Sequence, residues 1–306
     1  MAETTNPQAS SKAGVFAKRT GSTLFLWALV SGVFISFNSW AYLGLIGLLA
    51  MIAAVEYFTI AGKAGLACFP RFGIALALAY FLTLAVFLSA GNMPPPEIDA
   101  FFVALATTGA FTLQLRHPIR GTQPLVAVAT HVLGFIYIPV LFSFAARIIF
   151  MVPGGLETAG AVTKPGAFLL LWLVAVTKFT DMGAYITGSL IGKHKMIPHV
   201  SPGKTWEGIA GGIAFAQLGA CGLYALFTDQ LSFLQSYGHV VTLGFILATL
   251  AVIGDLAESI VKRSLDAKDS GNMLPGIGGA LDLIDSICFT APALFFYLKW
   301  ILLPAA

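Results

Sequence analysis

Charged side chains are scarce in this sequence. Its 306 residues include 17 Lys and Arg and 14 Asp and Glu, so 10% of the chain is charged while 58% is hydrophobic. With a mean hydropathy of +0.86, this composition excludes an ordinary soluble domain. The net charge of +3 adds little, and we expect no nucleic acid among the partners. The composition predicts an integral membrane protein.

Cysteine is scarce as well. Cys68, Cys221 and Cys288 lie in or at the edge of apolar segments without paired spacing, which argues against disulfides and against a zinc site. No small-residue cleavage site follows the first apolar segment, so we do not expect a signal peptide there. The polar residues 1–20 are predicted to form a disordered tail on the cytoplasmic side.

Long apolar runs, in contrast, are abundant. A membrane-spanning helix needs about 20 apolar residues, and its backbone groups must be satisfied within the segment. We therefore expect an all-α fold, a polytopic integral membrane protein with about nine transmembrane helices. The predicted spans are 22–37, 41–60, 72–90, 98–115, 124–150, 166–187, 207–227, 240–263 and 281–303.

Basic residues predict the orientation of these spans, because Lys and Arg accumulate on the cytoplasmic side. With the N-terminus inside, 13 of the 17 basic residues fall in cytoplasmic segments; outside fall Arg147, Lys164 and Lys299, and Lys178 lies within a span. This distribution favours an odd number of spans. It places the two loops richest in polar motifs in the cytoplasm.

The eighth predicted span carries a polar stripe. Asp255, Glu258, Ser259 and Lys262 follow i, i+3, i+4, i+7 spacing and so share one helix face. A carboxylate such as Asp255 within an apolar helix is expensive and is a functional candidate by default. The alternative is an ion pair of Asp255 with Lys262 or Arg263 that holds helices together.

Two further carboxylates, Asp282 and Asp285, lie one turn apart where the ninth span begins. Together with Asp255 they could bind a hard divalent cation such as Mg²⁺, commonly completed by substrate phosphates. Either aspartate alone could instead complement the helix macrodipole. However, Lys262, Arg263 and Lys268 crowd the same turn, and acidic ligands beside basic side chains suit a metal-bound polyphosphate.

The other motif-rich loop reads DMGAYITGSLIGKHKMIPHVSPGKTWEG over residues 181–208. Gly-Lys-Thr at 203–205 lacks the upstream glycine of a P-loop, and we interpret Ser201-Pro202 as a helix start instead. The helix amides and Lys204 would then bind a phosphate. The alternative is an ordinary basic loop. Lys178 and Asp181 could form a neutralising ion pair, and we expect Glu56 and His131 to be packing residues.

These two stretches resemble a known family. Residues 259–285 read SIVKRSLDAKDSGNMLPGIGGALDLID, and this segment closely resembles the signature of the phosphatidate cytidylyltransferases. The 181–208 loop is similar to the same family's other characteristic stretch. The resemblance covers roughly residues 166–303. It divides the chain into the tail, N-terminal transmembrane helices over 21–165 and a catalytic transmembrane region over 166–306.

The resemblance implies a Mg²⁺-dependent membrane enzyme that joins CTP to phosphatidic acid, giving CDP-diacylglycerol and pyrophosphate, with its site facing the cytoplasm of a bacterial inner membrane. It implies metal binding by Asp255, Asp282 and Asp285, and catalytic roles for Lys262, Arg263, Asp282 and Asp285. The implied substrate-binding residues are Asp181, Ser201, Lys204, Thr205, Glu207, Ser259, Lys268 and Asp269. The sequence leaves the oligomeric state open, a homodimer included.

The chain departs from the family signature at three positions. Ile277 replaces a usual His, Leu283 replaces a usual Arg between the two aspartates, and Ala280 replaces a branched aliphatic residue. An enzyme acting on a different lipid and an inactive membrane scaffold therefore stay open as alternatives. A transporter is a further alternative, although the charges gather at span ends and the halves show no repeat.

Overall fold

The computed structural model describes residues 24, 26–66, 68–151, 162–267, 270–271 and 278–303. Helices dominate these residues. In chain order the elements are α2 (Ser39–Lys63), α3 (Pro70–Ser89), α4 (Pro96–Gln114), α5 (Gln123–Phe135), the π-helix η1 (Ile136–Val140), α6 (Leu141–Met151), α7 (Lys164–Ile191), β1 (Lys195–Ile197), β2 (Ser201–Thr205), α8 (Trp206–Leu226), the 3₁₀-helix η2 (Ser232–Leu234), α9 (Tyr237–Ser264), α10 (Ala280–Tyr297) and the π-helix η3 (Leu298–Leu302). The predicted tail 1–20 lies outside the described residues.

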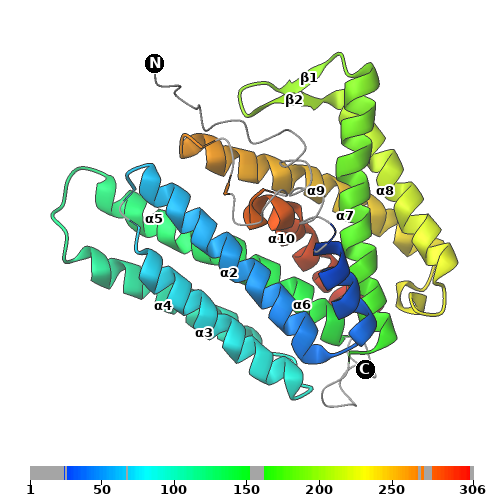
Figure 1. The fold of residues 1–306 in the computed structure, drawn as a ribbon, viewed down its shortest axis with the longest axis horizontal. Helices are drawn as coiled ribbons and strands as arrows, with labels where there is room; N and C mark the ends of the chain where they lie inside the picture. The colour runs from blue at the N-terminus through cyan, green and yellow to red at the C-terminus, as the bar shows by residue number, and fades with distance from the viewer. Residues whose placement is uncertain are drawn as a thin grey trace, which may run out of the picture.

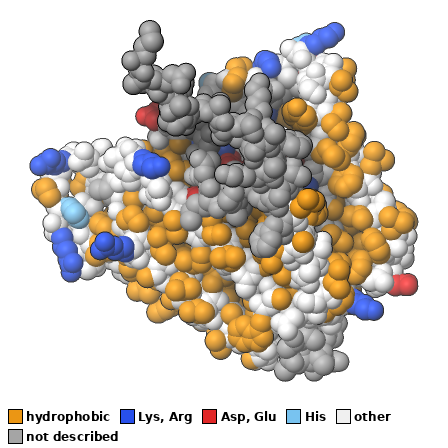
Figure 2. Space-filling view, in the orientation of Figure 1, with side chains coloured by type: hydrophobic (Ala, Val, Ile, Leu, Met, Phe, Trp, Pro, Cys, Tyr) orange, Lys and Arg blue, Asp and Glu red, His pale blue; other side chains and the backbone are white. Residues whose placement is uncertain are grey.

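Seven helices in the described chain are long and apolar enough to cross a bilayer. They are Ser39–Lys63, Pro70–Ser89, Gln123–Met151, Lys164–Ile191, Trp206–Leu226, Tyr237–Ser264 and Ala280–Leu302. The remaining two predicted spans correspond to the short apolar helix Leu26–Ser36 and to α4. Hydrophobic side chains are spread over the lower part of the visible surface, where charged side chains are few (Figure 2). The chain is a multi-pass membrane protein, as its composition predicts.

The central element of the bundle is α10. It packs against α9 and α7 of the C-terminal region and also against α2 and α6 of the N-terminal region (Figure 1). The main hydrophobic cluster accordingly contains buried residues from both regions, among them Tyr57, Trp172 and Leu294. The helix that carries Asp282 and Asp285 is therefore held on several sides. The division of the chain at residue 165 stays a prediction.

Small residues let α7 and α8 approach closely. A Cβ added at Gly212 would lie 2.9 Å from the carbonyl oxygen of Thr180, and one at Gly208 would lie 2.9 Å from that of Ala184. Deeper in the pair, Trp172 Nε1 donates a hydrogen bond of 3.0 Å to the carbonyl of Ala220. The close approach at Gly208 and Gly212 places the start of α8 beside the half of α7 that carries Asp181.

A buried ion pair joins the N-terminal helices. Arg147 of α6 lies 2.5 Å from Asp99 of α4, and the Arg147 side chain is only 5% exposed. The Tyr80 hydroxyl of α3 donates to the same carboxylate at 2.7 Å. His131 of α5 also behaves as a packing residue, since its ring stacks on Phe72 at 5.2 Å.

The C-terminal ends of α2 and α9 lie together at one end of the bundle. Ile60 and Ala61 of α2 form a buried cluster with Leu265, which directly follows α9. The basic residues Lys63, Lys262 and Arg263 belong to the last turns of these helices. Their common location agrees with the prediction that all three residues lie on the same side of the membrane; that this side is cytoplasmic stays a prediction.

The fold is nearly all-α, as predicted, and it includes one short hairpin in which Lys195–Ile197 and Ser201–Thr205 pair in antiparallel fashion between α7 and α8. This hairpin corrects one prediction. Ser201-Pro202 is not a helix start: α8 begins at Trp206, and Thr205 caps it by accepting a hydrogen bond of 3.1 Å from the amide of Gly208. A hairpin is compatible with a membrane protein because only lipid-exposed segments require a helical backbone. Pro202 is tolerated in β2 because a two-stranded sheet has only edge strands.

Candidate functional site

The hairpin and four helices enclose a cavity of about 570 Å³. This volume is typical of small-molecule sites. The lining residues are Thr180, Asp181, Ala184, Tyr185, Gly188 and Ser189 of α7; Lys195, Ser201, Gly203, Lys204 and Thr205 of the hairpin; Gly208 and Ile209 of α8; Val252 and Asp255 of α9; and Asp282, Asp285 and Ser286 of α10. The cavity thus brings together the two motif-rich stretches identified in the sequence.

Lys204 crosses the cavity from the hairpin to α9. Its ammonium group forms an ion pair with the Asp255 carboxylate and donates a hydrogen bond of 3.3 Å to the carbonyl of Val252. The partner of Asp255 is therefore neither Lys262 nor Arg263. Because Lys204 is also part of the cavity wall, it can contact an anion that enters.

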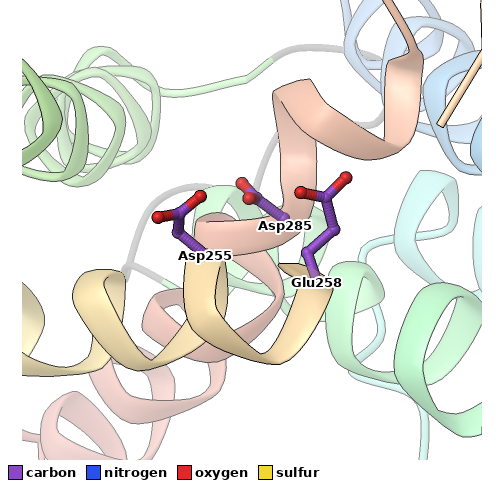
Figure 3. A group of neighbouring side chains, drawn as sticks. All are labelled: Asp255, Glu258 and Asp285. Carbon is purple, nitrogen blue, oxygen red and sulfur yellow. The ribbon is translucent and has the colours of Figure 1, made fainter. Parts of the chain in front are cut away.

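Three carboxylates converge between α9 and α10. Asp255 and Glu258 of α9 and Asp285 of α10 each offer an oxygen, and these oxygens all lie within 4.8 Å of one another. Figure 3 shows the three side chains directed toward the same side of the two helices. Glu258 and Asp285 are buried. Oxygen donors at this spacing suit a hard divalent cation.

Asp282 takes a different place from the other carboxylates. Its Oδ1 accepts a hydrogen bond of 2.8 Å from Lys262, and its Oδ2 accepts one of 3.2 Å from the backbone amide of Gly279 at the start of α10. Lys262 also lies 2.7 Å from Glu258. The lysine therefore links Asp282 to the buried carboxylate cluster. The predicted metal trio of Asp255, Asp282 and Asp285 differs from the observed trio, in which Glu258 stands in place of Asp282.

Glu207 anchors the hairpin instead of lining the cavity. Its carboxylate accepts hydrogen bonds from the backbone amides of Lys193 and His194 and lies 2.5 Å from Nδ1 of His194. These contacts join the first turn of α8 to the strand entry. Glu207 therefore shapes the site by fixing the hairpin that carries Lys204.

The other predicted site residues fall into three groups. The cavity lining contains Asp181, Ser201, Lys204, Thr205, Asp255, Asp282 and Asp285. Lys262 contacts this lining through Asp282, whereas Ser259 and the exposed Arg263 of α9 are not part of it. Lys268, Asp269 and the substituted position Ile277 lie outside the described residues. The predicted Lys178–Asp181 ion pair is present at 3.4 Å.

The structure adds residues that the sequence interpretation did not assign to the site. Glu258 had a visible signal, since it lies three residues after Asp255 in a buried helix face. Ser286 and Tyr185 had none, because their place on the cavity wall depends on tertiary packing. Leu283, at the position where the family usually has Arg, packs against the main hydrophobic cluster.

Comparisons with known proteins identify the family of this chain. The sequence model of the cytidylyltransferase family matches residues 17–301. The chain is 34% identical to a phosphatidate cytidylyltransferase of Bacillus subtilis over 69% of this chain and 71% of that protein. It is 36% identical to one of Haemophilus influenzae over 45% of this chain and 48% of that protein.

The chain is also 39% identical to the uncharacterized protein YnbB of Escherichia coli over 44% of each chain. The match therefore spans about half the length of YnbB and of the Haemophilus protein. The match to the family model, in contrast, extends over nearly the whole sequence and includes both stretches that line the cavity. The chain belongs to the cytidylyltransferase family.

Proposed function

We propose that the protein is a phosphatidate cytidylyltransferase, which converts CTP and phosphatidic acid into CDP-diacylglycerol and pyrophosphate. The single observation that carries this proposal is the cavity at one end of the membrane bundle, whose lining contains Lys204, Asp255 and Asp285, with the buried Glu258 clustered beside the two aspartates. The names of the Bacillus and Haemophilus relatives support the choice of substrates.

We further propose that Mg²⁺ binds Asp255, Glu258 and Asp285. The fit rests on three carboxylate oxygens within 4.8 Å, the donor type that this ion prefers. The lining contains four carboxylates, Asp181, Asp255, Asp282 and Asp285, but only two lysines, so a nucleotide triphosphate would meet acidic side chains unless a cation were present. When bound, Mg²⁺ would neutralise phosphate charge and polarise the phosphoryl group.

The chain's own residues then have separate tasks. A phosphate oxygen of phosphatidic acid forms a bond to the α-phosphorus of CTP, and the bond from that phosphorus to the β-phosphate bridging oxygen breaks as pyrophosphate leaves. Lys204 on the hairpin and Lys195 beside it would bind the phosphates and stabilise the leaving group. Lys262 and Asp282 would keep the carboxylate cluster in place. No covalent enzyme intermediate is required, because the phosphate of phosphatidic acid is itself the nucleophile, and the residues of the site hold the two anions in a reactive orientation.

We also propose that the site faces the cytoplasm of a bacterial inner membrane. The distribution of Lys and Arg supports this orientation, and the presence of CTP in the cytoplasm would make it productive. A homodimer stays a prediction.

The test is incorporation of radiolabelled CTP into lipid by the purified protein with phosphatidic acid and Mg²⁺. Asp285→Asn should abolish most product formation and raise the Mg²⁺ concentration for half-maximal activity, because it removes one of three clustered ligands. The matched control is Asp229→Asn, which changes an exposed aspartate beyond the opposite end of α8 and should leave the activity unchanged. Product formation by Asp285→Asn equal to wild type would refute the assigned site.

Absence of product in the wild type, with CTP still bound, would favour one of the alternatives. Supplying other phosphorylated lipids would then separate an enzyme with a different lipid substrate from an inactive scaffold. Activity with phosphatidic acid, in contrast, would show that Leu283 and Ile277 are compatible with catalysis.

A further inference from the structure

The N-terminus of α10 lacks a capping side chain of its own. The first amides of a helix have no partner within the helix, and the residue before it commonly provides a side-chain oxygen for the second or third of them. In α10 this residue is Gly279, which has no side chain. Asp282 binds the amide of Gly279 itself, so the amides of the first turn need another acceptor.

Glu56 of α2 provides that acceptor. Its Oε2 accepts a hydrogen bond of 3.0 Å from the backbone amide of Leu281, the second residue of α10. Glu56 is 2% exposed and lies 225 residues upstream of its partner. A carboxylate at this position also interacts favourably with the positive end of the helix dipole.

The space around the Glu56 carboxylate explains two glycines of the adjoining segment. A Cβ at Gly279 would lie 2.8 Å from Glu56 Oε2 and closer still to Ser270 Oγ, and one at Gly271 would lie 2.5 Å from Glu56 Oε1. Both distances are shorter than real Cβ contacts. Gly271 and Gly279 thus leave room for a carboxylate from a distant helix, and the close packing fixes where that carboxylate lies.

The contact acts on the residues of the site through the first turn of α10. Asp282, which binds Lys262, directly follows Leu281, and Asp285 of the carboxylate cluster lies one turn later. Any shift of the amide of Leu281 therefore moves both aspartates relative to α9. Displacements of about 1 Å at a catalytic centre can lower rates by about 100-fold.

We propose that Glu56 is a positioning residue of the active site: a helix cap that the N-terminal region supplies to α10 and that sets the distance between Asp285 and the α9 carboxylates. The activity measurements that test this inference rest on the proposed cytidylyl transfer, whereas the capping contact itself does not. This role of Glu56 differs from the sequence expectation, under which Glu56 is a packing residue and its loss would affect stability alone.

The test compares Glu56→Ala and Glu56→Gln with Asp99→Asn in the purified full-length protein. Asp99→Asn serves as the matched control because it also changes a carboxylate of the N-terminal region, but a partly buried one that pairs with Arg147 away from the cavity. Glu56→Gln keeps an acceptor oxygen at nearly the same volume. It therefore guards against the case in which Glu56→Ala does not fold.

We expect Glu56→Ala to raise the Mg²⁺ concentration for half-maximal activity and to lower kcat/KM for CTP by about tenfold or more. Glu56→Gln should fall between Glu56→Ala and the wild type. Asp99→Asn should lower thermal stability while the Mg²⁺ requirement of the folded protein stays unchanged. An unchanged Mg²⁺ requirement in both Glu56 variants would overturn the proposal.

A second readout does not depend on the reaction. Hydrogen exchange of a peptide covering residues 278–286 should become about fivefold faster in Glu56→Ala, as expected when a helix cap is lost, and should not change in Asp99→Asn. Unchanged exchange in Glu56→Ala would refute the capping role even if activity fell. The wild type could show no cytidylyl transfer while Glu56→Ala still exchanges faster than the wild type. That result would support the cap and refute the proposed function.

Discussion

Lys262 has two carboxylate partners on two helices. It lies 2.7 Å from Glu258 of its own helix and 2.8 Å from Asp282 of α10. Glu258 is almost completely buried, with a side chain only 2% exposed. An uncompensated carboxylate in such a place is costly, so Lys262 stabilises the site even before any substrate is considered.

We therefore predict two separable effects of Lys262→Met. The thermal stability of the detergent-solubilised protein should fall, since removing one partner of a buried ion pair costs about 3–5 kcal/mol. The incorporation of CTP into lipid should fall as well, because Asp282 loses the contact that orients it. Both can be measured on one preparation, by thermal unfolding and by product formation.

The double variant Lys262→Met with Glu258→Gln provides the control. It removes the buried charge along with its partner, so much of the stability should return while the activity stays low. Recovery of activity together with stability would contradict a role of these residues in the reaction and would leave only the structural ion pair.

The individual site residues were predictable from sequence to a limited extent. Asp255, Asp282 and Asp285 could be identified because a carboxylate in an apolar helix is conspicuous and spacing places it on one face. The choice between Asp282 and Glu258 as the third member of the cluster could not be made, because it depends on the rotation of α10 against α9. Glu56 was assigned to packing, since no local pattern connects it with a segment 225 residues away.

The hairpin β1–β2 is the element that completes the cavity. It contributes Lys195, Ser201, Lys204 and Thr205 to the lining. Its position depends on Glu207, which binds the chain at the entry to the first strand. A two-stranded hairpin is marginally stable on its own, and the Glu207 contacts therefore decide how well Lys204 is placed.

We predict that Glu207→Ala loosens the hairpin. Trypsin should cleave after Lys193 and Lys195 faster than in the wild type, and KM for CTP should rise about tenfold, because hydrogen bonds to a charged group contribute about 1.5–3 kcal/mol. Cleavage after the exposed Arg116 and Arg120 between α4 and α5 provides an internal reference. Digestion and steady-state kinetics measure the two effects.

His194→Ala is the milder companion variant. It removes the imidazole contact but keeps the amide hydrogen bonds of residues 193 and 194 to Glu207, so its effect on cleavage should be smaller. Equal cleavage rates in the wild type and Glu207→Ala would show that other contacts hold the hairpin.

Elements were more predictable than the contacts between them. Hydropathy located the long helices, including the continuous stretch Gln123–Met151, within which Pro139 lies in the π-helix η1. It could not show the hairpin, because short strands of three and five residues carry little periodicity. The start of α8 was misplaced by a few residues, since both Ser201 and Thr205 are suitable capping residues and tertiary pairing selects Thr205.

At the scale of the whole molecule, the cavity lies at one end of the bundle and the loop after α8 lies beyond the opposite end. α8 has 21 residues and so spans about 30 Å, the thickness of the hydrocarbon region. Lys195 and Asp229, on either side of it, should therefore lie on opposite faces of the membrane.

We predict that single cysteines at these two positions label from opposite sides. In a background with Cys68, Cys221 and Cys288 replaced, a membrane-impermeant maleimide should modify Asp229→Cys in intact cells. It should modify Lys195→Cys only after permeabilisation, because the basic hairpin side is expected in the cytoplasm. The reverse pattern would contradict the orientation derived from charge.

The contact between Glu56 and Leu281 also has a consequence for biosynthesis. A ribosome makes α2 long before α10, so the second helix of this bundle waits in the membrane for most of translation before it can cap the helix that carries Asp282 and Asp285. Shorter nascent chains can already present Lys204 and Asp255 but have no complete carboxylate cluster. The carboxylate cluster is therefore complete only after α10, which packs against both regions of the bundle, has been synthesised.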